Sequence, residues 1–209
     1  MEWRSDANHG HSRILARCFA GADQGSGAAA LTVQLEDETW QKASSWKDYC
    51  DTLARKAAFL GHEGCLRVLH ELGCDAAASL VAANANGFTP AHLAAISGHE
   101  GCLRVLHEFG GHAAASLVAA TANGSTPAHR AAAEGQEGCL RVLHELGGDA
   151  AASLVAADAD GETPAHYAAA KGHEGCLRVL HALGGDAAAS LAVAAADGET
   201  PAHRAAAGG

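Results

Sequence analysis

The fold of this chain is decided by the stretch Thr89-Pro90-Ala91-His92-Leu93-Ala94-Ala95-Ile96-Ser97-Gly98-His99-Glu100-Gly101-Cys102-Leu103-Arg104-Val105-Leu106-His107-Glu108-Phe109-Gly110, which returns nearly unchanged further along. Its opening phrase, Thr-Pro-Ala-His, begins at Thr89, Thr126, Thr163 and Thr200, a spacing of 37 residues each time. A fixed period of this size is the signature of a stacked repeat protein. One period earlier, Thr52 keeps the rhythm without the Pro and the His, as an atypical terminal unit would.

Each unit predicts two short helices. The Thr supplies an N-cap hydroxyl, the Pro suits the first helical position, and the His at N3 can reach back to the Thr. Gly98 and its equivalents end this helix, because glycine adopts the left-handed conformation without strain. Apolar residues cover a wide face of the second helix, which Gly110 and Gly111 end: Cys102, Leu103, Val105, Leu106 and Phe109. So small a pair cannot bury its own apolar face, so the units must stack.

The repeated sequence motifs resemble those of a known family. Thr-Pro-Ala-His-x-Ala-Ala-x-x-Gly-His resembles the first-helix signature of the ankyrin repeat family, and the stretch from Val142 to Asp149 resembles its second-helix ending. The resemblance covers residues 52–209. It implies an all-α, ankyrin-type helical-repeat solenoid, here built from 37-residue units, that serves as a protein-binding module.

The length of the unit departs from the family pattern. An ankyrin unit usually has about 33 residues, and the extra residues here lie in the phrase Ala-Ala-Ala-Ser-Leu-Val-Ala-Ala, where the family builds a short β-hairpin finger. The phrase is rich in Ala and holds a repeating Leu at positions 80, 117, 154 and 191. This composition favours an added helical turn over a hairpin.

We expect two parts in the chain. Residues 1–44 form an irregular N-terminal arm with a Gly-rich linker, and residues 45–209 hold the repeats. The predicted units are 52–88, 89–125, 126–162, 163–199 and a partial unit, 200–209.

Within the arm, residues 12–20 suit a short helix and residues 31–35 alternate apolar and polar as a half-buried strand does. A lone strand must either dock along the repeats or pair with the edge of a partner. A capping box at Ser45 and Asp48 predicts a helix that runs into the first unit and caps the stack.

Composition excludes several classes of protein. The chain is 48% hydrophobic but only 4% aromatic, which suits small, closely packed helices. A formal net charge of −10 argues against nucleic acid as the main partner, because phosphate binding needs clustered Lys and Arg. No apolar run is long enough to insert into a membrane and the first residues do not resemble a secretory signal. We therefore expect an intracellular protein, cytoplasmic or nuclear.

A ladder of cysteines invites a metal-site interpretation. Cys65, Cys102, Cys139 and Cys176 recur, and three of them follow a His by three residues, although Gln136 interrupts that pattern. Packed helices lie about 8–10 Å apart, whereas zinc ligands must come within about 2.3 Å of one ion. The same spacing exceeds the roughly 7 Å Cα limit of a disulfide. The cysteines are therefore predicted to be core residues in a reducing compartment, and no metal or cofactor is expected.

The repeated histidines do not predict catalysis. His92 and its equivalents at 129, 166 and 203 stand beside a capping Thr, and no nucleophile recurs with them. The acidic phrase at residues 158–162 resembles part of a calcium loop but lacks two ligands, so a turn is expected. His70 and Arg67, with their repeats, predict a solvated face. We expect no catalytic residue and no enzyme.

The units differ from one another at few places, before the Thr, after the His and at the end of the first helix. These positions resemble those where ankyrin proteins present their concave binding surface. Variation confined to one face suggests that its side chains are not needed for packing and are free to bind a partner. Neutral change over exposed sites would give the same pattern. The predicted contacts form an N-terminal apolar patch and a C-terminal mixed polar group: Phe59, Leu60, Phe88, Leu93 and Ile96, then Arg130, Glu134, Glu162, Tyr167 and Lys171.

Two functions remain open. The first is a non-catalytic module that binds a protein partner through the variable face. The second is a structural or accessory subunit of a large multiprotein assembly, which contacts other subunits through the N-terminal arm or the C-terminal end. The arm carries Trp3 and Trp40, and the C-terminal half-unit would expose apolar surface because no second helix follows.

Overall fold

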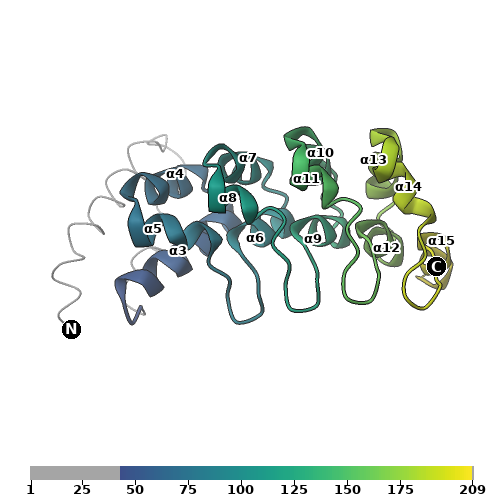
Figure 1. The fold of residues 1–209 in the computed structure, drawn as a ribbon, viewed down its shortest axis with the longest axis horizontal. Coiled ribbons are helices and arrows are strands. Elements are labelled where there is room, and N and C mark those ends of the chain that lie inside the picture. Colours follow the sequence, from purple (N-terminus) through teal and green to yellow (C-terminus); the bar gives the residue numbers. More distant parts are fainter. Residues whose placement is uncertain (1–42, 209) are drawn as a thin grey trace.

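The computed structural model describes residues 43–208, and within this range the chain forms helices joined by loops, without a β-strand. The helices lie side by side in an elongated array that runs from α3 to α15 (Figure 1). Their bounds are α3 Trp46–Leu60, α4 Glu63–Leu72, α5 Cys74–Ala78, η1 Ser79–Val81, α6 Pro90–Ser97, α7 Glu100–Glu108, α8 Gly111–Ala115, α9 Pro127–Ala133, α10 Glu137–Leu146, α11 Gly148–Ala152, α12 Pro164–Ala170, α13 Glu174–Leu183, α14 Gly185–Ala189, η2 Ser190–Ala192 and α15 Pro201–Gly208.

The array consists of two main layers of parallel helices. The first helices of the units, α3, α6, α9, α12 and α15, pack each against the next, and we call them the first-layer helices. The second helices, α4, α7, α10 and α13, pack against one another in the same way and form the second layer. The expected all-α helical-repeat solenoid, with a period of 37 residues, is confirmed by this arrangement.

The ends of the first-layer helices follow the predicted signals. Thr89 is extended, with φ −86° and ψ 169°, and forms a capping box with His92, while Pro90 begins α6. Gly98 ends this helix in the left-handed conformation, with φ 78°. At the N-terminal end of the described chain, the Ser45 side chain accepts a hydrogen bond from the Asp48 N–H, so the predicted cap of α3 is confirmed.

The expected extra helical turn is present, but it does not replace the hairpin-like loop. Short helices follow the second-layer helices, each closed by a serine hydroxyl such as that of Ser116, which donates to the Ala113 carbonyl at 2.6 Å. After them the chain still turns back in a regular loop, seen below the helices in Figure 1. In the first loop the Asn84 N–H donates to the Phe88 carbonyl at 3.0 Å, and the later loops repeat this bond: Thr121 to Ser125, Asp158 to Glu162, and Ala195 to Glu199.

The helical turn was predicted correctly, but the prediction that it takes the place of the hairpin was wrong, because a hairpin-like loop follows it. Helix propensity describes only the Ala-rich phrase, whereas the loop is held by hydrogen bonds that close on the residues after it. Adjacent loops are also joined, because the Ala159 N–H donates to the Asn123 carbonyl and the Ala196 N–H donates to the Asp160 carbonyl, each at 3.0 Å.

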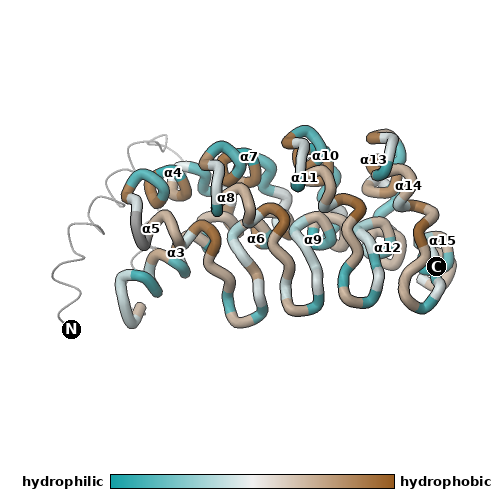
Figure 2. The backbone as a smooth tube through the Cα atoms, in the orientation of Figure 1, coloured by the Kyte–Doolittle hydropathy of each residue, from teal (hydrophilic) through white to brown (hydrophobic). Residues whose placement is uncertain are grey.

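The core lies between the two layers and is made mostly of Ala and Leu. Leu66, Leu103, Leu140 and Leu180 are fully buried on the second-layer helices, and Tyr49 of α3 is fully buried as well. Figure 2 shows hydrophilic segments along the outer side of the second-layer helices and at the tips of the loops. The apolar surface is thus shared between neighbouring units, as stacking requires.

Some expectations concern residues outside the described range. The predicted arm helix at 12–20, the linker and the strand at 31–35 lie there and stay predictions. The boundary between residues 44 and 45, and the unit boundaries drawn from the sequence, also remain as predicted from the sequence.

Candidate functional site

Each first-layer helix is fixed at its start by a threonine and a histidine. The Thr89 N–H donates to His92 Nδ1 at 3.3 Å, so the ring proton must lie on Nε2. Nε2 then donates to the Ser125 carbonyl, 3.1 Å away, in the loop that leads into α9. His129 and His166 make the equivalent bonds to the carbonyls of Glu162 and Glu199. The predicted caps are confirmed, and they also tie each helix to the following loop.

His92 and His129 are buried and neutral. Desolvation lowers the pKa of His92 to about 4, against a usual value of 6.5, and Arg130 and His129 lower it further. Burial likewise lowers the pKa of His129. Since both rings are fully buried and both nitrogens are engaged, they hold the helices in place and are closed to a substrate.

A second ladder of side chains caps the ends of the first-layer helices. His99 Nε2 lies 3.0 Å from the Phe59 carbonyl, and His173 Nε2 lies 2.9 Å from the Ala133 carbonyl. The amide of Gln136 donates to the Ile96 carbonyl at 3.1 Å. Carbonyls at a helix C-terminus lack partners within the helix, so a donor from the next unit satisfies them. Gln136 can stand in the histidine ladder because both side chains present an N–H.

The cysteine ladder lies in the core, as predicted. Cys102, Cys139 and Cys176 are fully buried, and desolvation raises the pKa of their thiols to about 12, 12 and 11. They are free thiols that stay protonated at neutral pH. Over residues 43–208, no three His, Cys, Asp or Glu side chains are placed to hold a metal ion.

The first-layer helices have one face that is not buried, and the units differ on it. In α6, α9 and α12 the buried positions hold the same residues, Pro, Ala, His, Ala and Ala. Leu93, Ile96 and Ser97 are three and four residues apart in α6, so they share the remaining face. We call this surface the first-layer face, and its positions are Leu93, Ile96, Ser97, Arg130, Ala133, Glu134, Tyr167, Ala170 and Lys171. Ala133 is the buried exception.

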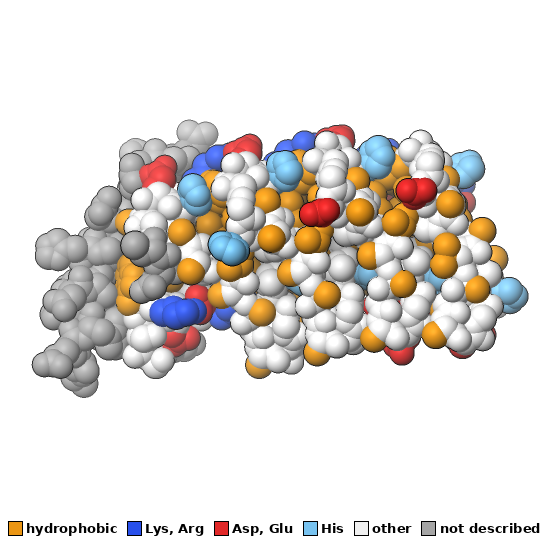
Figure 3. All heavy atoms as spheres, viewed as in Figure 1, with side chains coloured by type: hydrophobic (Ala, Val, Ile, Leu, Met, Phe, Trp, Pro, Cys, Tyr) orange, Lys and Arg blue, Asp and Glu red, His pale blue; other side chains and the backbone are white. Residues whose placement is uncertain are grey.

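The second-layer helices also have an exposed face, and most of its residues recur from unit to unit, with Ala182 in place of a glutamate as an exception. The exposed Glu, Arg and His positions of α7 hold Glu100, Arg104 and His107, and α4, α10 and α13 repeat the same three residue types. Figure 3 shows charged and His side chains along this edge of the molecule. Some of these side chains join neighbouring units, as in the ion pair between Arg104 and Glu145 at 2.5 Å.

Side chains on the first-layer face contact the ends of the loops. The Arg130 guanidinium lies over the Phe88 ring, 5.1 Å from its centroid, and the same ring meets His92 edge-on at 5.6 Å. Tyr167 meets His129 edge-on at 5.4 Å, and its hydroxyl donates to Asp158 Oδ2 at 2.7 Å. Desolvation and this carboxylate raise the pKa of Tyr167 to about 12, so the hydroxyl remains a donor.

The structure separates the predicted contact residues into two rows. Phe88, Leu93, Arg130, Glu162 and Tyr167 belong to the start of the first-layer helices and the loops that lead into them. The second row stands at the C-terminal ends of the same helices: Phe59, Leu60, Ile96, Glu134 and Lys171.

Exposure differs within these rows. Phe59 and Leu60 are 49% and 38% exposed, and Glu134 and Lys171 are also exposed, whereas Phe88, Leu93 and Ile96 are half-buried.

Phe88 was placed in an apolar patch from the sequence, and the structure brings it to Arg130, a member of the predicted polar group. The two predicted groups are therefore continuous at this point. Glu162 is engaged as well, because its carboxylate pairs with Arg204 at 2.9 Å.

Sequence reasoning missed the role of Asp158. It is 8% exposed, and Oδ1 accepts hydrogen bonds from the N–H groups of Asp160 and Glu162 at 3.0 and 2.9 Å. The expected turn in place of a calcium loop is confirmed by these bonds. The pattern Asp-x-Asp-Gly could have indicated such a turn, but the contact with Tyr167 comes from the next first-layer helix.

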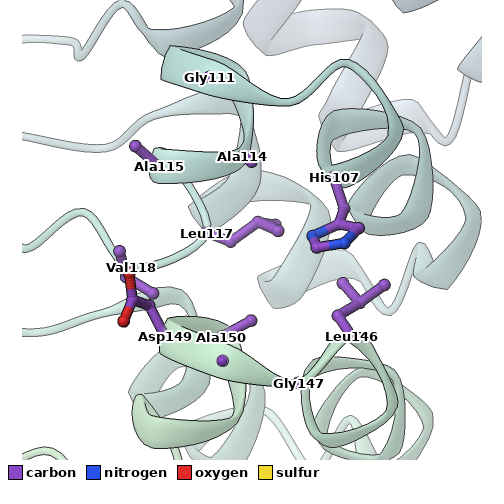
Figure 4. A pocket seen from close by; sticks show the side chains of 11 residues that line it. His107, Gly111, Ala114, Ala115, Leu117, Val118, Leu146, Gly147, Asp149 and Ala150 are labelled. Carbon is purple, nitrogen blue, oxygen red and sulfur yellow. The ribbon is translucent and has the colours of Figure 1, made fainter.

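A shallow groove lies between the second and third units. Figure 4 shows three side chains that point into it: His107 from α7, Leu146 from α10, and Leu117 from the segment after α8. Its volume of about 280 Å³ is at the lower edge of the range of small-molecule sites, about 300–1,000 Å³, and few polar groups converge in it. The groove therefore does not compete with the first-layer face as the candidate site.

Comparison with known proteins agrees with the fold. A family model described as ankyrin repeats (3 copies) matches residues 53–153, and one described as ankyrin repeats (many copies) matches residues 128–181. Together the two matches cover more than half of the chain. No curated protein matches the sequence. Among the described residues, no helix is both long enough and apolar enough to cross a membrane. The chain belongs to the ankyrin repeat family.

Proposed function

We propose that this chain is a non-catalytic protein-binding module that holds a protein partner against its first-layer face and the adjoining loop ends. The proposed contact residues are Phe59, Leu60, Phe88, Leu93, Ile96, Arg130, Glu134, Glu162, Tyr167 and Lys171. Ankyrin repeats are generally protein–protein interaction modules, and proteins of the family are typically non-catalytic. The proposal assigns that general role to one surface of this chain.

The observation that carries the proposal is the contrast between two exposed faces. Three exposed second-layer positions, those of Glu100, Arg104 and His107, hold the same residue in all four units. On the first-layer face of α6, α9 and α12, two of the three positions hold a different residue each time, and the third holds Ile once and Ala twice. Variation that gathers on one of two exposed faces is the pattern expected of a surface that recognises a partner.

The side chains on this face suit protein recognition. Arg and Tyr are enriched among the residues that dominate binding energy, and both are half-buried here at Arg130 and Tyr167. Each is already held by a neighbour, Arg130 by the Phe88 ring and Tyr167 by Asp158. Such anchors lose little conformational freedom on binding, so more of the contact energy contributes to affinity.

The test combines partner identification with two substitutions. The chain would be purified, sized by chromatography with light scattering, and used to capture proteins from its native extract. Leu93→Asp and Tyr167→Ala should each weaken the captured partner while the helical circular dichroism is unchanged. Affinity that is unchanged in both variants would contradict the site.

A second function, a structural subunit of a larger assembly, is favoured by the last unit. Leu66, Leu103 and Leu140 are fully buried by the unit that follows each of them, whereas Leu177 at the same position of α13 is only partly buried. Val193 nearby is 42% exposed. A chain that aggregates alone but elutes natively in a large complex would favour this alternative over the binding module.

We propose that the protein acts in the cytoplasm or nucleus. Five cysteines among the described residues are free and buried, which suits a reducing compartment. Fractionation of the cells that make the protein tests this directly, and recovery from the secreted fraction would contradict it.

A further inference from the structure

Arg130 is a half-buried cation without an acidic partner. Its guanidinium stacks on the Phe88 ring, and its Nε, like that of Arg204, is buried without a hydrogen-bond partner among the described residues. No carboxylate of residues 43–208 lies within ion-pair distance of it. The Ser125 hydroxyl, five residues before Arg130, is likewise buried without a partner. Leaving a buried donor unpaired is unfavourable, and more so for a charged group.

Arg204 shows what this position looks like when its partners are present. It stands two repeat periods after Arg130, at the same place in its unit. Its guanidinium pairs with three carboxylates, Glu162 at 2.9 Å, Asp197 at 2.7 Å and Glu199 at 3.0 Å. The arginine of this repeat position therefore has the reach and the geometry to hold several carboxylates.

The partners of Arg204 are missing around Arg130 at the equivalent places. Counting back two periods, Glu162 becomes Phe88, Asp197 becomes Asn123 and Glu199 becomes Ser125. All three acids are thus replaced by uncharged residues, while the arginine is kept.

One acid in this part of the molecule is already engaged. Asp158 influences both His129 and Tyr167, but its Oδ2 accepts the Tyr167 hydroxyl and its Oδ1 accepts two backbone N–H groups. Its two oxygens are thus engaged by α12 and by its own loop, and it forms no ion pair with Arg130. The unmet demand at Arg130 is therefore for a carboxylate from outside residues 43–208.

We propose that Arg130 binds an Asp or Glu side chain of the protein partner, which takes the place that Glu162, Asp197 and Glu199 fill at Arg204. This inference rests on the proposed function and names the chemistry of one contact within it. A carboxylate is the chemistry indicated, because the equivalent arginine of the same chain binds carboxylates. Stacking on the Phe88 ring restricts the orientation of the planar guanidinium, so less conformational freedom is lost when a carboxylate binds.

The test uses the full chain as the target. The probe is a displayed library of random linear peptides. Peptides would be selected on the unaltered chain, and their affinities measured for it and for Arg130→Met, which keeps a long side chain and removes the charge. Arg104→Met is the matched control, because Arg104 is exposed on the second layer and paired with Glu145.

The selected peptides should share an Asp or Glu. Changing it to Asn or Gln, or changing Arg130 to Met, should each weaken binding about tenfold or more, and the two changes together should cost little more than either alone. Arg104→Met should leave affinity within about twofold. A second pair sharpens the test: Phe88→Glu supplies the carboxylate that Glu162 gives Arg204 and should weaken binding more than Phe88→Gln.

The failure of this inference differs from the failure of the proposed function. Peptides that lose affinity for Leu93→Asp or Tyr167→Ala but bind Arg130→Met normally would overturn the carboxylate contact and keep the surface. Peptides unaffected by all three substitutions, or no enrichment over background, would overturn both. Dependence on the free C-terminal carboxylate, with no Asp or Glu preference, would also overturn the assignment to a side chain.

Discussion

The two exposed faces of this molecule carry opposite patterns. On the second layer, three exposed positions hold the same Glu, Arg and His in all four units, and Ala182 is an exception at a fourth, whereas on the first layer most exposed residues differ from unit to unit. Exposure alone therefore does not decide which positions vary. Second-layer residues repeat the same contact with the next unit, as in the pairs Arg67–Glu108 and Arg104–Glu145. First-layer residues also contact neighbouring loops, but with different partners, as Arg130 does with Phe88 and Tyr167 with Asp158.

The second-layer constraints are visible between units. A Cβ atom at Gly101 would lie 1.7 Å from Glu63 Oε1, so the glutamate of one unit lies against the glycine of the next. His70 stacks on Phe109 with ring centroids 4.0 Å apart. Arg67 pairs with Glu108 at 2.8 Å. These residues are exposed at the surface, yet each one touches the following unit.

The largest expected effect lies in the core between the faces. Leu106→Ala should lower the free energy of unfolding by about 2–5 kcal/mol, because Leu106 is fully buried and its removal leaves a cavity. Leu93→Ala on the half-buried first-layer face should cost clearly less. Urea unfolding measures both, and equal losses would contradict the separation between core and face.

Acid should weaken the histidine contacts that support the first-layer helices. The native pKa of His92 is about 4 and its unfolded value is 6.5, so the unfolded chain binds the proton first as the pH falls. The stabilisation is present above about pH 6.5 and is lost toward pH 4, by about 3 kcal/mol for this group.

The check is the pH dependence of a matched pair. The destabilisation caused by His92→Gln should be greatest near pH 7 and shrink toward pH 4. Leu106→Ala, which removes no titratable group, is the control. A cost of His92→Gln that is the same at both pH values would refute the role of the neutral ring.

The loops beneath the first-layer face should respond to single methyl groups. Gly124 and Gly198 hold the same loop position with φ of +81° and +83°, so alanine strains the backbone of both by about 1–2 kcal/mol. At Gly124 the new Cβ would also lie 2.8 Å from the Ala159 nitrogen, whereas nothing lies within 4 Å at Gly198. Thermal unfolding should show the greater loss for Gly124→Ala, and equal losses would count against the packing of adjacent loops.

The smallest effect concerns the second-layer ion pairs. Arg104→Ala should change the free energy of unfolding by no more than about 1 kcal/mol, because the pair with Glu145 is exposed to solvent. Adding salt should reduce the difference further. A loss of several kcal/mol would mean that this ion pair contributes more to stability than a solvent-exposed pair is expected to.

Local features of the fold could be predicted from the sequence. The threonine, proline and glycine signals act within a few residues, so the start of α6 at Pro90 and the stop at Gly98 followed from the repeat itself. The burial of Cys102 followed from helical spacing. These predictions needed no knowledge of the neighbouring unit.

Contacts between units could not be predicted in the same way. The bond from Gln136 to the Ile96 carbonyl spans 40 residues, and the sequence showed only that a histidine ladder was interrupted. The stacking of Arg130 on Phe88 depends on how the loop that leads into α6 contacts α9, the first-layer helix of the following unit. The regular loops were missed because helix propensity describes the Ala-rich phrase and not the hydrogen bonds that follow it.

The most direct measurement compares partner affinity for two multiply substituted chains. One carries Leu93→Ala, Arg130→Ala and Tyr167→Ala on the first-layer face, and the other carries Arg104→Ala, Arg141→Ala and His144→Ala on the second layer. Both should keep the helical content of the parent, and only the first should lose the partner, by about 100-fold or more. Equal affinities of the two chains, or a greater loss in the second, would contradict binding at the first-layer face.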